Sequence, residues 1–326
     1  MSERVAPDRL SPGEHEEIRQ DIRNDFLSVS APQGKPRAII VAGQPGAGKG
    51  SLAKAAREEL AADGGSVLID PDRLRTWHPN YQLHLENDKT AAERVHADAS
   101  QWAKELRQDA IEGRRNIVLD ATLNDKDKTR ELLGQLRKAG YETEVRVLAV
   151  HRRDSRQGVY ARYENAKEQG KAARWVPESA QDEAYKGMPI ALGHIERNGW
   201  ADKVTVMRRD GTVIYRNGRA DSATSGLSQI AVMAERARDP TAEEKLQHLR
   251  LWDKIQGQMQ ARGADSGEVA KVSEYRWEAH DRMKADQSVP SAPGRADPTP
   301  QPGAESIRAL SAAQKARQEE WRRQTR

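Results

Sequence analysis

A glycine-rich turn constrains the fold of this 326-residue chain more than any other feature. It fits the pattern Gly-x4-Gly-Lys and reads Gly43-Gln44-Pro45-Gly46-Ala47-Gly48-Lys49-Gly50-Ser51. The β-branched run Arg37–Ala42 precedes it, and a helical pattern at Lys49–Ala62 follows. In that order, backbone N–H groups converge on a phosphate at a helix N-terminus, and the lysine reaches the β- and γ-phosphates. We therefore expect a P-loop that binds ATP; the alternative is a strand-to-helix turn without a ligand.

The residue after the P-loop lysine departs from the usual pattern. Most P-loops carry a hydroxyl there that binds Mg²⁺, whereas this chain has Gly50 and then Ser51. Nucleoside monophosphate kinases also carry Gly-Lys-Gly before a hydroxyl residue, so the variant is compatible with phosphoryl transfer. We expect Ser51 to serve the phosphates or the metal shell. Asp120, which ends an apolar strand, is expected to hold Mg²⁺ directly or through water; otherwise it is a strand-end carboxylate at a helix start.

Strands and helices alternate along the first half of the chain, which predicts an α/β fold with a parallel sheet flanked by helices. The expected strands are Arg37–Ala42, Ser66–Ile69, Asn116–Leu119 and Glu142–Val150. The expected helices are Ser11–Leu27, Lys49–Ala62, Asp88–Gly113, Lys126–Ala139, Ser155–Gln169 and Glu178–Asn198. After them, Lys203–Met207 and Thr212–Tyr215 flank Asp210-Gly211, which predicts a β-hairpin at an edge of the sheet.

Two acidic residues follow the second strand, as Asp70-Pro71-Asp72. Ligands bind at the carboxyl ends of strands in open α/β sheets, and a carboxylate near a γ-phosphate can accept the proton of an attacking hydroxyl. The plainer interpretation is that Asp70 caps a short helix with Pro71 at its first position. Both can hold, with Asp70 as the cap and Asp72 as the catalytic base.

Several separate segments together resemble the bacterial zeta toxins, which are P-loop kinases. The similar segments are Gly43–Leu52, Val67–Tyr81, Asn116–Asp125, Ala139–Val150, Ala161–Ala166, Ala173–Pro177 and the hairpin DGTVIY. They keep the family's order across about residues 18–217. The resemblance implies a kinase domain over residues 1–220 that transfers the ATP γ-phosphate to the 3′-hydroxyl of UDP-N-acetylglucosamine. It also implies a small helical antitoxin that obstructs the ATP site.

The resemblance assigns roles to individual residues. Lys49 matches the P-loop lysine and Asp72 the catalytic base, while Arg162 and Arg174 match arginines that clamp the ATP phosphates. Guanidinium groups suit that role because they neutralise charge on the transferred group. Without the resemblance, these two arginines would be ordinary surface residues of charged helices.

Acceptor contacts also follow from the resemblance alone. Glu105 matches a sugar-contacting glutamate if one gap is allowed, and Thr122 matches a substrate-contacting threonine. Asn124 stands where the family usually has an arginine that reaches the substrate. A lost positive charge beside a diphosphate-sugar predicts weaker or altered acceptor binding.

Composition excludes some classes of protein. There is no cysteine, so disulfides and Cys-based zinc sites are excluded. No apolar run approaches the ~20 residues that span a bilayer, and the N-terminus lacks an apolar signal region, so a cytoplasmic protein is expected. A net charge of +4 with 5% aromatic residues makes a nucleic-acid partner unexpected.

The composition changes after about Asp221. Residues 221–286 predict a charged helical extension with helices at Thr241–Ala261 and Glu268–Ala285. Residues 287–326 predict a Pro-rich linker, Gln287–Glu305, and a basic amphipathic helix, Ser306–Arg326. This tail is either a set of solvated helices or a docking segment. The second possibility supports an alternative function, an ATP-binding regulatory module with a degenerate kinase core and a partner-docking tail.

Overall fold

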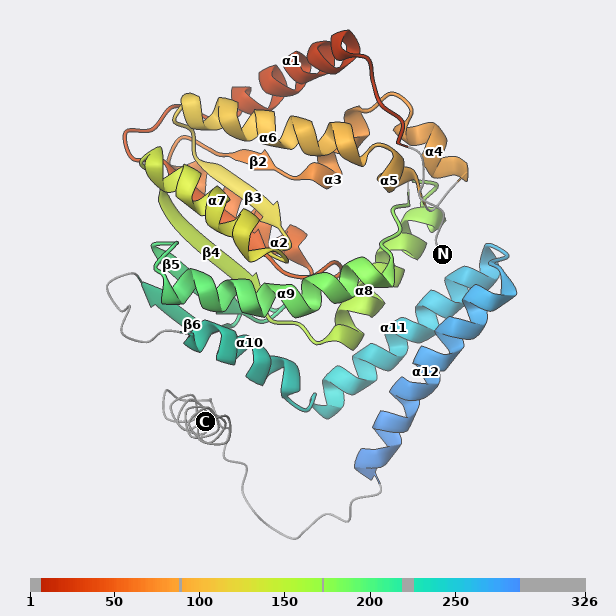
Figure 1. Cartoon of the computed structure of the whole chain (residues 1–326). Coiled ribbons are helices and arrows are strands. Elements are labelled where there is room, and N and C mark those ends of the chain that lie inside the picture. The colour runs from red at the N-terminus through yellow and green to blue at the C-terminus, as the bar shows by residue number, and fades with distance from the viewer. Residues whose placement is uncertain (1–6, 88–89, 172, 219–225, 288–326) are drawn as a thin grey trace, which may run out of the picture.

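The computed structural model describes residues 7–87, 90–171, 173–218 and 226–287. A six-stranded sheet runs through these residues in the order β2-β3-β1-β4-β5-β6. Its strands are β1 (Arg37–Ala42), β2 (Val67–Ile69), β3 (Ile117–Ala121), β4 (Glu142–Leu148), β5 (Lys203–Met207) and β6 (Val213–Gly218). The first five in space are parallel and β6 is antiparallel. The predicted α/β fold and its edge hairpin are confirmed (Figure 1).

The central strand β1 shows why both faces of the sheet must be covered. Successive side chains point to opposite faces. Ala38, Ile40 and Ala42 join one apolar cluster, while Ile39 and Val41 join another. Helix α2 (Lys49–Ala61) supplies the second cluster. The first cluster receives side chains from α1 (Pro12–Ser28), α6 (His96–Glu112), α7 (Lys126–Lys138) and α9 (Glu178–Arg197).

Several helices begin at the residues that the sequence marks as caps. The Ser11 side chain accepts from the N–H of Glu14, whose carboxylate returns to Ser11, and Thr241 and Glu244 repeat this capping box. The first box opens α1, and the second opens α11 (Ala242–Ala261). Asp125 caps α7 by accepting from two backbone N–H groups.

The structure differs from the prediction in several connecting segments. The helix expected at Asp88–Gly113 is divided at Val95 into α5 (Ala91–Arg94) and α6. Val95 is fully buried and packs with Tyr81 and Ala91, so tertiary packing sets this break. The short helix expected after Asp70 is present as α3 (Pro71–Leu74). The other short elements were not predicted: the 3-10 turn η1 (Arg75–Trp77), α4 (Tyr81–Asn87) and α10 (Leu227–Ala237).

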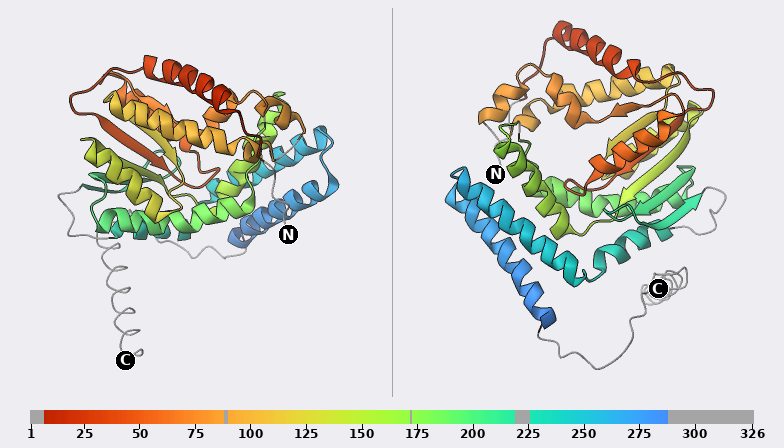
Figure 2. Two further views of the ribbon diagram at one scale, coloured as in Figure 1. Left: turned by 45° about the horizontal axis from the view of Figure 1, so that its top comes forward. Right: turned by 180° about the vertical axis from the view of Figure 1, so that it is seen from behind.

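A helical hairpin ends the described part of the chain. It consists of α11 and α12 (Ser266–Gln287), and it packs beside α8 (Arg152–Glu168), as Figures 1 and 2 show from opposite sides. A separate apolar cluster joins the three helices; its fully buried members include Trp252, Ile255 and Val272. The two helices predicted there are present. The predicted linker beyond Gln287 and the predicted terminal helix lie outside the described residues.

The helices that the structure describes include none with the length and apolarity needed to cross a bilayer.

Candidate active site

The parallel strands bring separated segments to one edge of the sheet. Gly43 follows β1, Asp70 follows β2, and Asp120 lies near the end of β3. Because β2, β3 and β1 are neighbours in that order, their carboxyl ends meet at the same edge. This is the edge at which ligands bind in open α/β sheets.

The P-loop is built around glycines that no other residue could replace without strain. Gly46 has φ +78° and Gly48, the N-cap of α2, has φ +100°. A Cβ atom at Gly46 would lie 1.9 Å from the carbonyl oxygen of Ser155, and one at Gly158 would lie 2.3 Å from the carbonyl oxygen of Gly46. The loop therefore touches α8 backbone to backbone. Gly158 was not predicted as a site residue, because only this tertiary contact reveals its role.

Lys49 lies at the centre of the loop. Its Nζ donates to the carbonyl oxygen of Gly43 at 2.9 Å and lies 3.3 Å from Oδ1 of Asp120. Burial raises the pKa of Asp120 to about 6, with the positive charge of Lys49 opposing that rise and Asp70 adding to it. A carboxylate so close to the P-loop lysine lies where the metal of an ATP complex is usually held.

Asp70 and Asp72 make different contacts in the structure. The Oδ1 of Asp70 accepts from the N–H of Asp72 at 2.9 Å and caps α3, so the capping interpretation is confirmed. The Asp72 carboxylate instead lies between two guanidinium groups. Its Oδ1 accepts from Nη1 of Arg75 at 2.7 Å, and its Oδ2 forms an ion pair with Arg174. Arg75 was not predicted as a site residue.

A cavity of about 420 Å³ brings Asp72, Arg162 and Arg174 together. It is lined by Leu68, Asp70, Asp72, Arg73, Tyr81, Arg162, Ala166 and Arg174. Burial lowers the pKa of Arg174 to about 10, which leaves the group protonated at neutral pH. Within the described residues, the guanidinium of Arg162 forms no hydrogen bond or ion pair, so it is available to an anion in the cavity.

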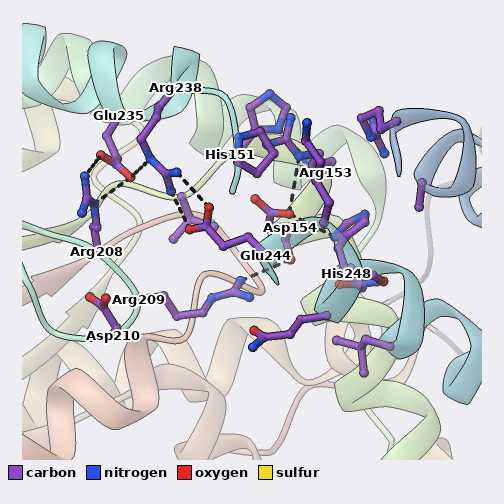
Figure 3. Close-up of a pocket in the computed structure, with 18 of the residues that line it drawn as sticks. His151, Arg153, Asp154, Arg208, Arg209, Asp210, Glu235, Arg238, Glu244 and His248 are labelled. Carbon is purple, nitrogen blue, oxygen red and sulfur yellow. Dashed lines mark hydrogen bonds and ion pairs between the residues drawn. The ribbon is translucent and has the colours of Figure 1, made fainter. Parts of the chain in front are cut away.

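A second cavity, of about 480 Å³, adjoins the P-loop at Arg209 (Figure 3). Arg209 donates to the carbonyl oxygens of Gly46 at 2.8 Å and Ala47 at 3.2 Å, so it braces the outside of the loop. Buried Gln44 donates to the carbonyl of Val150 at 2.7 Å and accepts from Arg236 at 2.9 Å. The sequence predicted the turn at Asp210-Gly211 but gave no signal for Arg209.

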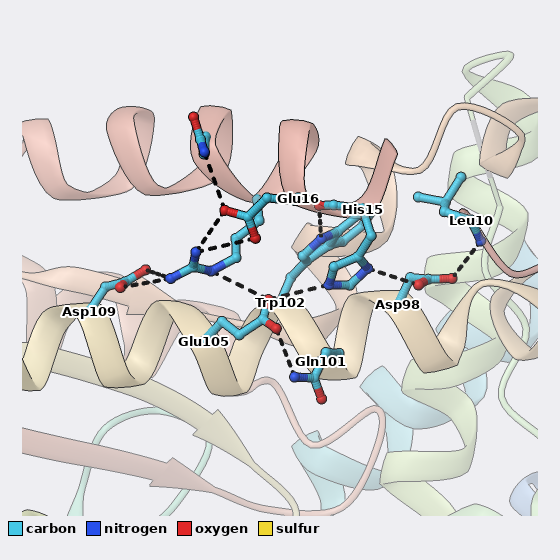
Figure 4. A network of polar contacts seen from close by, with 10 residues as sticks. Leu10, His15, Glu16, Asp98, Gln101, Trp102, Glu105 and Asp109 are labelled. Atoms are coloured by element: carbon cyan, nitrogen blue, oxygen red, sulfur yellow. Dashed lines mark hydrogen bonds and ion pairs between the residues drawn. The ribbon is translucent and has the colours of Figure 1, made fainter. Parts of the chain in front are cut away.

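The structure does not bring Glu105 into the cavity of Asp72. Its carboxylate lies against α1, 3.3 Å from Nε2 of His15 and 3.7 Å from Nε of Arg19 (Figure 4). Thr122 and Asn124 follow β3, and the Thr122 hydroxyl donates to the Asn124 side-chain oxygen at 3.0 Å. Neither of them lines the cavity of Asp72. Acceptor roles for these three residues stay predictions.

The oxygen ligands suit Mg²⁺ in type but are few. Ser51 is exposed in the first turn of α2, and Asp120 lies near the end of β3, beside Lys49. Among the residues described here, no three His, Asp or Glu side chains gather as a metal cage. Mg²⁺ at phosphoryl-transfer sites takes one or two carboxylates, with phosphate and water supplying the remaining ligands. Asp120 and Ser51 therefore fit a metal that arrives with the nucleotide.

Comparisons with known proteins place this fold in context. A family model described as Zeta toxin matches residues 23–220. Toxin zeta of Enterococcus hirae is 29% identical over 182 residues, which is 55% of this chain and 63% of that protein. Toxin PezT of Streptococcus pneumoniae serotype 4 is 24% identical over 203 residues, 62% of this chain and 79% of that toxin. The match thus spans less than two thirds of the Enterococcus toxin.

Two solved structures share the fold. One comes from a study of the PezAT chromosomal toxin-antitoxin system of Streptococcus pneumoniae. It aligns with a TM-score of 0.65 and 20% identity, covering 78% of this chain and 98% of that chain. The other is the AvrRxo1-ORF1:-ORF2 complex with ATP. It aligns with a TM-score of 0.51 and 13% identity, covering 88% and 97%.

Proposed function

The chain belongs to the zeta toxin family, and from that premise we propose that it is an ATP-dependent kinase that acts as a bacterial toxin. The acceptor is a hydroxyl of a nucleotide-sugar, with UDP-N-acetylglucosamine as the first candidate. One observation carries the proposal. A carboxylate, Asp72, and two guanidinium groups, Arg162 and Arg174, line one cavity at the sheet edge that also holds the P-loop.

Each group has a distinct task in the proposed reaction. The P-loop N–H groups and Lys49 hold the β- and γ-phosphates. Asp72 takes the proton of the acceptor hydroxyl while the hydroxyl oxygen forms a bond to the γ-phosphorus. The bond from that phosphorus to the β–γ bridging oxygen breaks, and its electron pair leaves with ADP. Arg162 and Arg174 neutralise the charge on the transferred group, which is the largest contribution a protein makes to this chemistry.

Asp120, with Ser51 through water, would hold Mg²⁺, which supplies charge neutralisation for the phosphates.

Arg174 links nucleotide binding to the base. Its guanidinium pairs with Asp72, and both residues line the cavity. A γ-phosphate there offers Arg174 a second anionic partner, and charge-assisted guanidinium–phosphate bonds are strong. An exchange of Arg174 from Asp72 to the phosphate would free one oxygen of the base for the acceptor hydroxyl. ATP would then prepare the carboxylate that activates its own acceptor.

Thr122 and Asn124 are proposed acceptor contacts at the turn after β3. Glu105 can contact the acceptor only if its carboxylate leaves its present partners, His15 and Arg19. We propose a small helical antitoxin as the restraining partner, because the family relation implies one.

The direct test incubates the protein with γ-labelled ATP, Mg²⁺ and a panel of UDP-sugars and dinucleotides. Label should move to UDP-N-acetylglucosamine with the wild type and not with Asp72→Asn, while both bind ATP. Induced expression in bacteria should arrest growth only for the wild type. Wild-type turnover by Asp72→Asn would show that Asp72 is not the base.

A regulatory module remains the second candidate, and Gly50 and Asn124 favour it because both depart from the kinase pattern. ATP binding without transfer to any acceptor would move this candidate to first place. Label on a different acceptor would instead make Asn124 a specificity change within a working kinase.

A further inference from the structure

Helix α8 presents two faces with different partners. Ser155, Gly158 and Val159 meet the P-loop at Gly46, and Arg162 on the same face lines the cavity of Asp72. These residues follow the i, i+3, i+4, i+7 spacing of one helix face. The helix is therefore both a wall of the P-loop and the support of a phosphate-clamping arginine.

The other face of α8 contacts α11 through polar side chains. Asp154 lies 3.0 Å from Nδ1 of His248, and Gln157 donates to the carbonyl oxygen of His248 at 2.6 Å (Figure 3 shows the Asp154–His248 contact). Two turns further along, Glu164 accepts from Arg262 at 2.7 Å to Nε and 2.9 Å to Nη2.

The Glu164–Arg262 pair is well placed to fix α8. The Glu164 side chain is only 2% exposed, and its guanidinium partner binds in the bidentate, charge-assisted geometry. Separating a buried carboxylate from its charged partner lowers the stability of the fold. The Glu164–Arg262 pair therefore holds α8 against the end of α11. Arg162 lies two residues before it in the same helix. A shift of α8 against α11 would carry Arg162 with it.

An aromatic cluster fixes the second arginine from the same side. Trp175 follows Arg174 in the chain, and its ring lies 4.9 Å from that of Tyr160 in edge-to-face contact. Tyr160 in turn lies 5.6 Å from Trp252 of α11 and 6.1 Å from Tyr275 of α12, also edge to face. Such pairs have a preferred geometry as well as buried area. The hairpin thus supports the segment that carries Arg174.

We infer that the α11–α12 hairpin positions the phosphate-clamping arginines: Arg262 acts on Arg162 through Glu164, and Trp252 and Tyr275 act on Arg174 through Tyr160 and Trp175. The inference rests on the proposed function for the roles of Arg162 and Arg174. Arg262 is a positioning residue, because it contacts neither the cavity nor the P-loop. Position matters here because displacements near 1 Å can reduce turnover by up to about 100-fold.

The test measures the preference for MgATP over MgADP by calorimetry, since only contacts to the γ-phosphate distinguish these two probes. Arg262→Gln should reduce the preference by about 10-fold, and Arg262→Lys should lose less. The matched control is Arg250→Gln, the same substitution at an exposed position of α11. Its preference should stay within about 2-fold of wild type. Thermal unfolding shows whether each variant is folded. If Arg262→Gln does not fold, Trp252→Phe replaces it as the test variant.

A double-mutant cycle separates positioning from general loosening of the fold. In an Arg162→Lys background, Arg262→Gln should change the preference by less than about 2-fold, because the group it positions is already gone. An equal loss in both backgrounds, or no loss in either, would overturn the inference. A wild type without preference for MgATP would overturn both the clamp assigned to the arginines and this inference. A preference for MgATP without phosphate transfer to any acceptor would count against the proposed kinase activity and leave this inference standing.

Discussion

The Nζ atom of Lys49 lies 3.3 Å from Oδ1 of Asp120, so the P-loop lysine and the carboxylate at the end of β3 form one ion pair. Their side chains are 12% and 22% exposed, respectively. Even so, burial raises the pKa of Asp120 to about 6, so desolvation outweighs the attraction of the lysine. The charge of Asp120 therefore changes close to the physiological range.

This pKa predicts how metal-dependent nucleotide binding responds to pH. Asp120 is ionised above about pH 6 and protonated below it, and only the ionised form attracts Mg²⁺. The affinity for MgATP should therefore rise as pH increases through that value. Calorimetry across the range, with ATP and chelator as the metal-free control, gives the measurement. Asp120→Asn should bind MgATP more weakly with no such rise; a variant that kept the rise would assign it to another group.

The same shift predicts a pH dependence of stability. The folded pKa of Asp120 lies above the usual aspartate value of 3.8, so the folded state holds the proton more tightly between about pH 4 and 6. Its contribution to the free energy of unfolding therefore falls as pH rises through this window, by about 3 kcal/mol at most. Urea unfolding of wild type and Asp120→Asn at both ends of the window measures the difference. Parallel pH profiles would contradict the prediction.

Gly46→Ala should damage the P-loop. The new Cβ would lie 1.9 Å from the carbonyl oxygen of Ser155, at a residue with φ +78°. The left-handed backbone alone costs about 1–2 kcal/mol, and α8 must also move away. Gly50→Ala is the matched control, since its Cβ would meet no atom within 4 Å. It should stabilise the helix by up to about 1 kcal/mol. Thermal unfolding and ATP affinity compare the two variants; equal behaviour would show that the contact with α8 is unimportant.

Gly50→Ser should strengthen metal-dependent ATP binding. It restores a hydroxyl directly after the P-loop lysine, where that group usually binds Mg²⁺, and the space around Gly50 is open. The expected gain is several-fold in MgATP affinity, with metal-free ATP unaffected. Gly50→Ala shares the change in backbone freedom and lacks the hydroxyl. A gain of the same size in both variants would trace the effect to the backbone.

Local pattern predicted the P-loop, the strands and most long helices, because each depends on residues close together in the chain. The pairing of Asp72 with Arg75 and Arg174 could not be predicted in this way. Arg75 belongs to a short turn whose conformation depends on burial against α6, since its guanidinium lies 3.2 Å from Nδ1 of His96.

The contacts of Glu105 could not be predicted from local pattern either. The resemblance alone assigned it to the acceptor, and that role stays a prediction. The Glu105 carboxylate contacts His15 and Arg19 because α1 packs across α6, and that packing is a tertiary property. The hairpin α11–α12 had the composition of solvated helices, yet Trp252 and Tyr275 are buried against α8.

The backbone contact between Gly46 and Gly158 has a consequence for how such a gene can change over generations. The atoms that obstruct a side chain at either position belong to the main chain. No trimming of a neighbouring side chain can therefore make room, and no second mutation of that kind can rescue the first. Lineages that keep this chain in use should retain both glycines while the charged surface around them drifts.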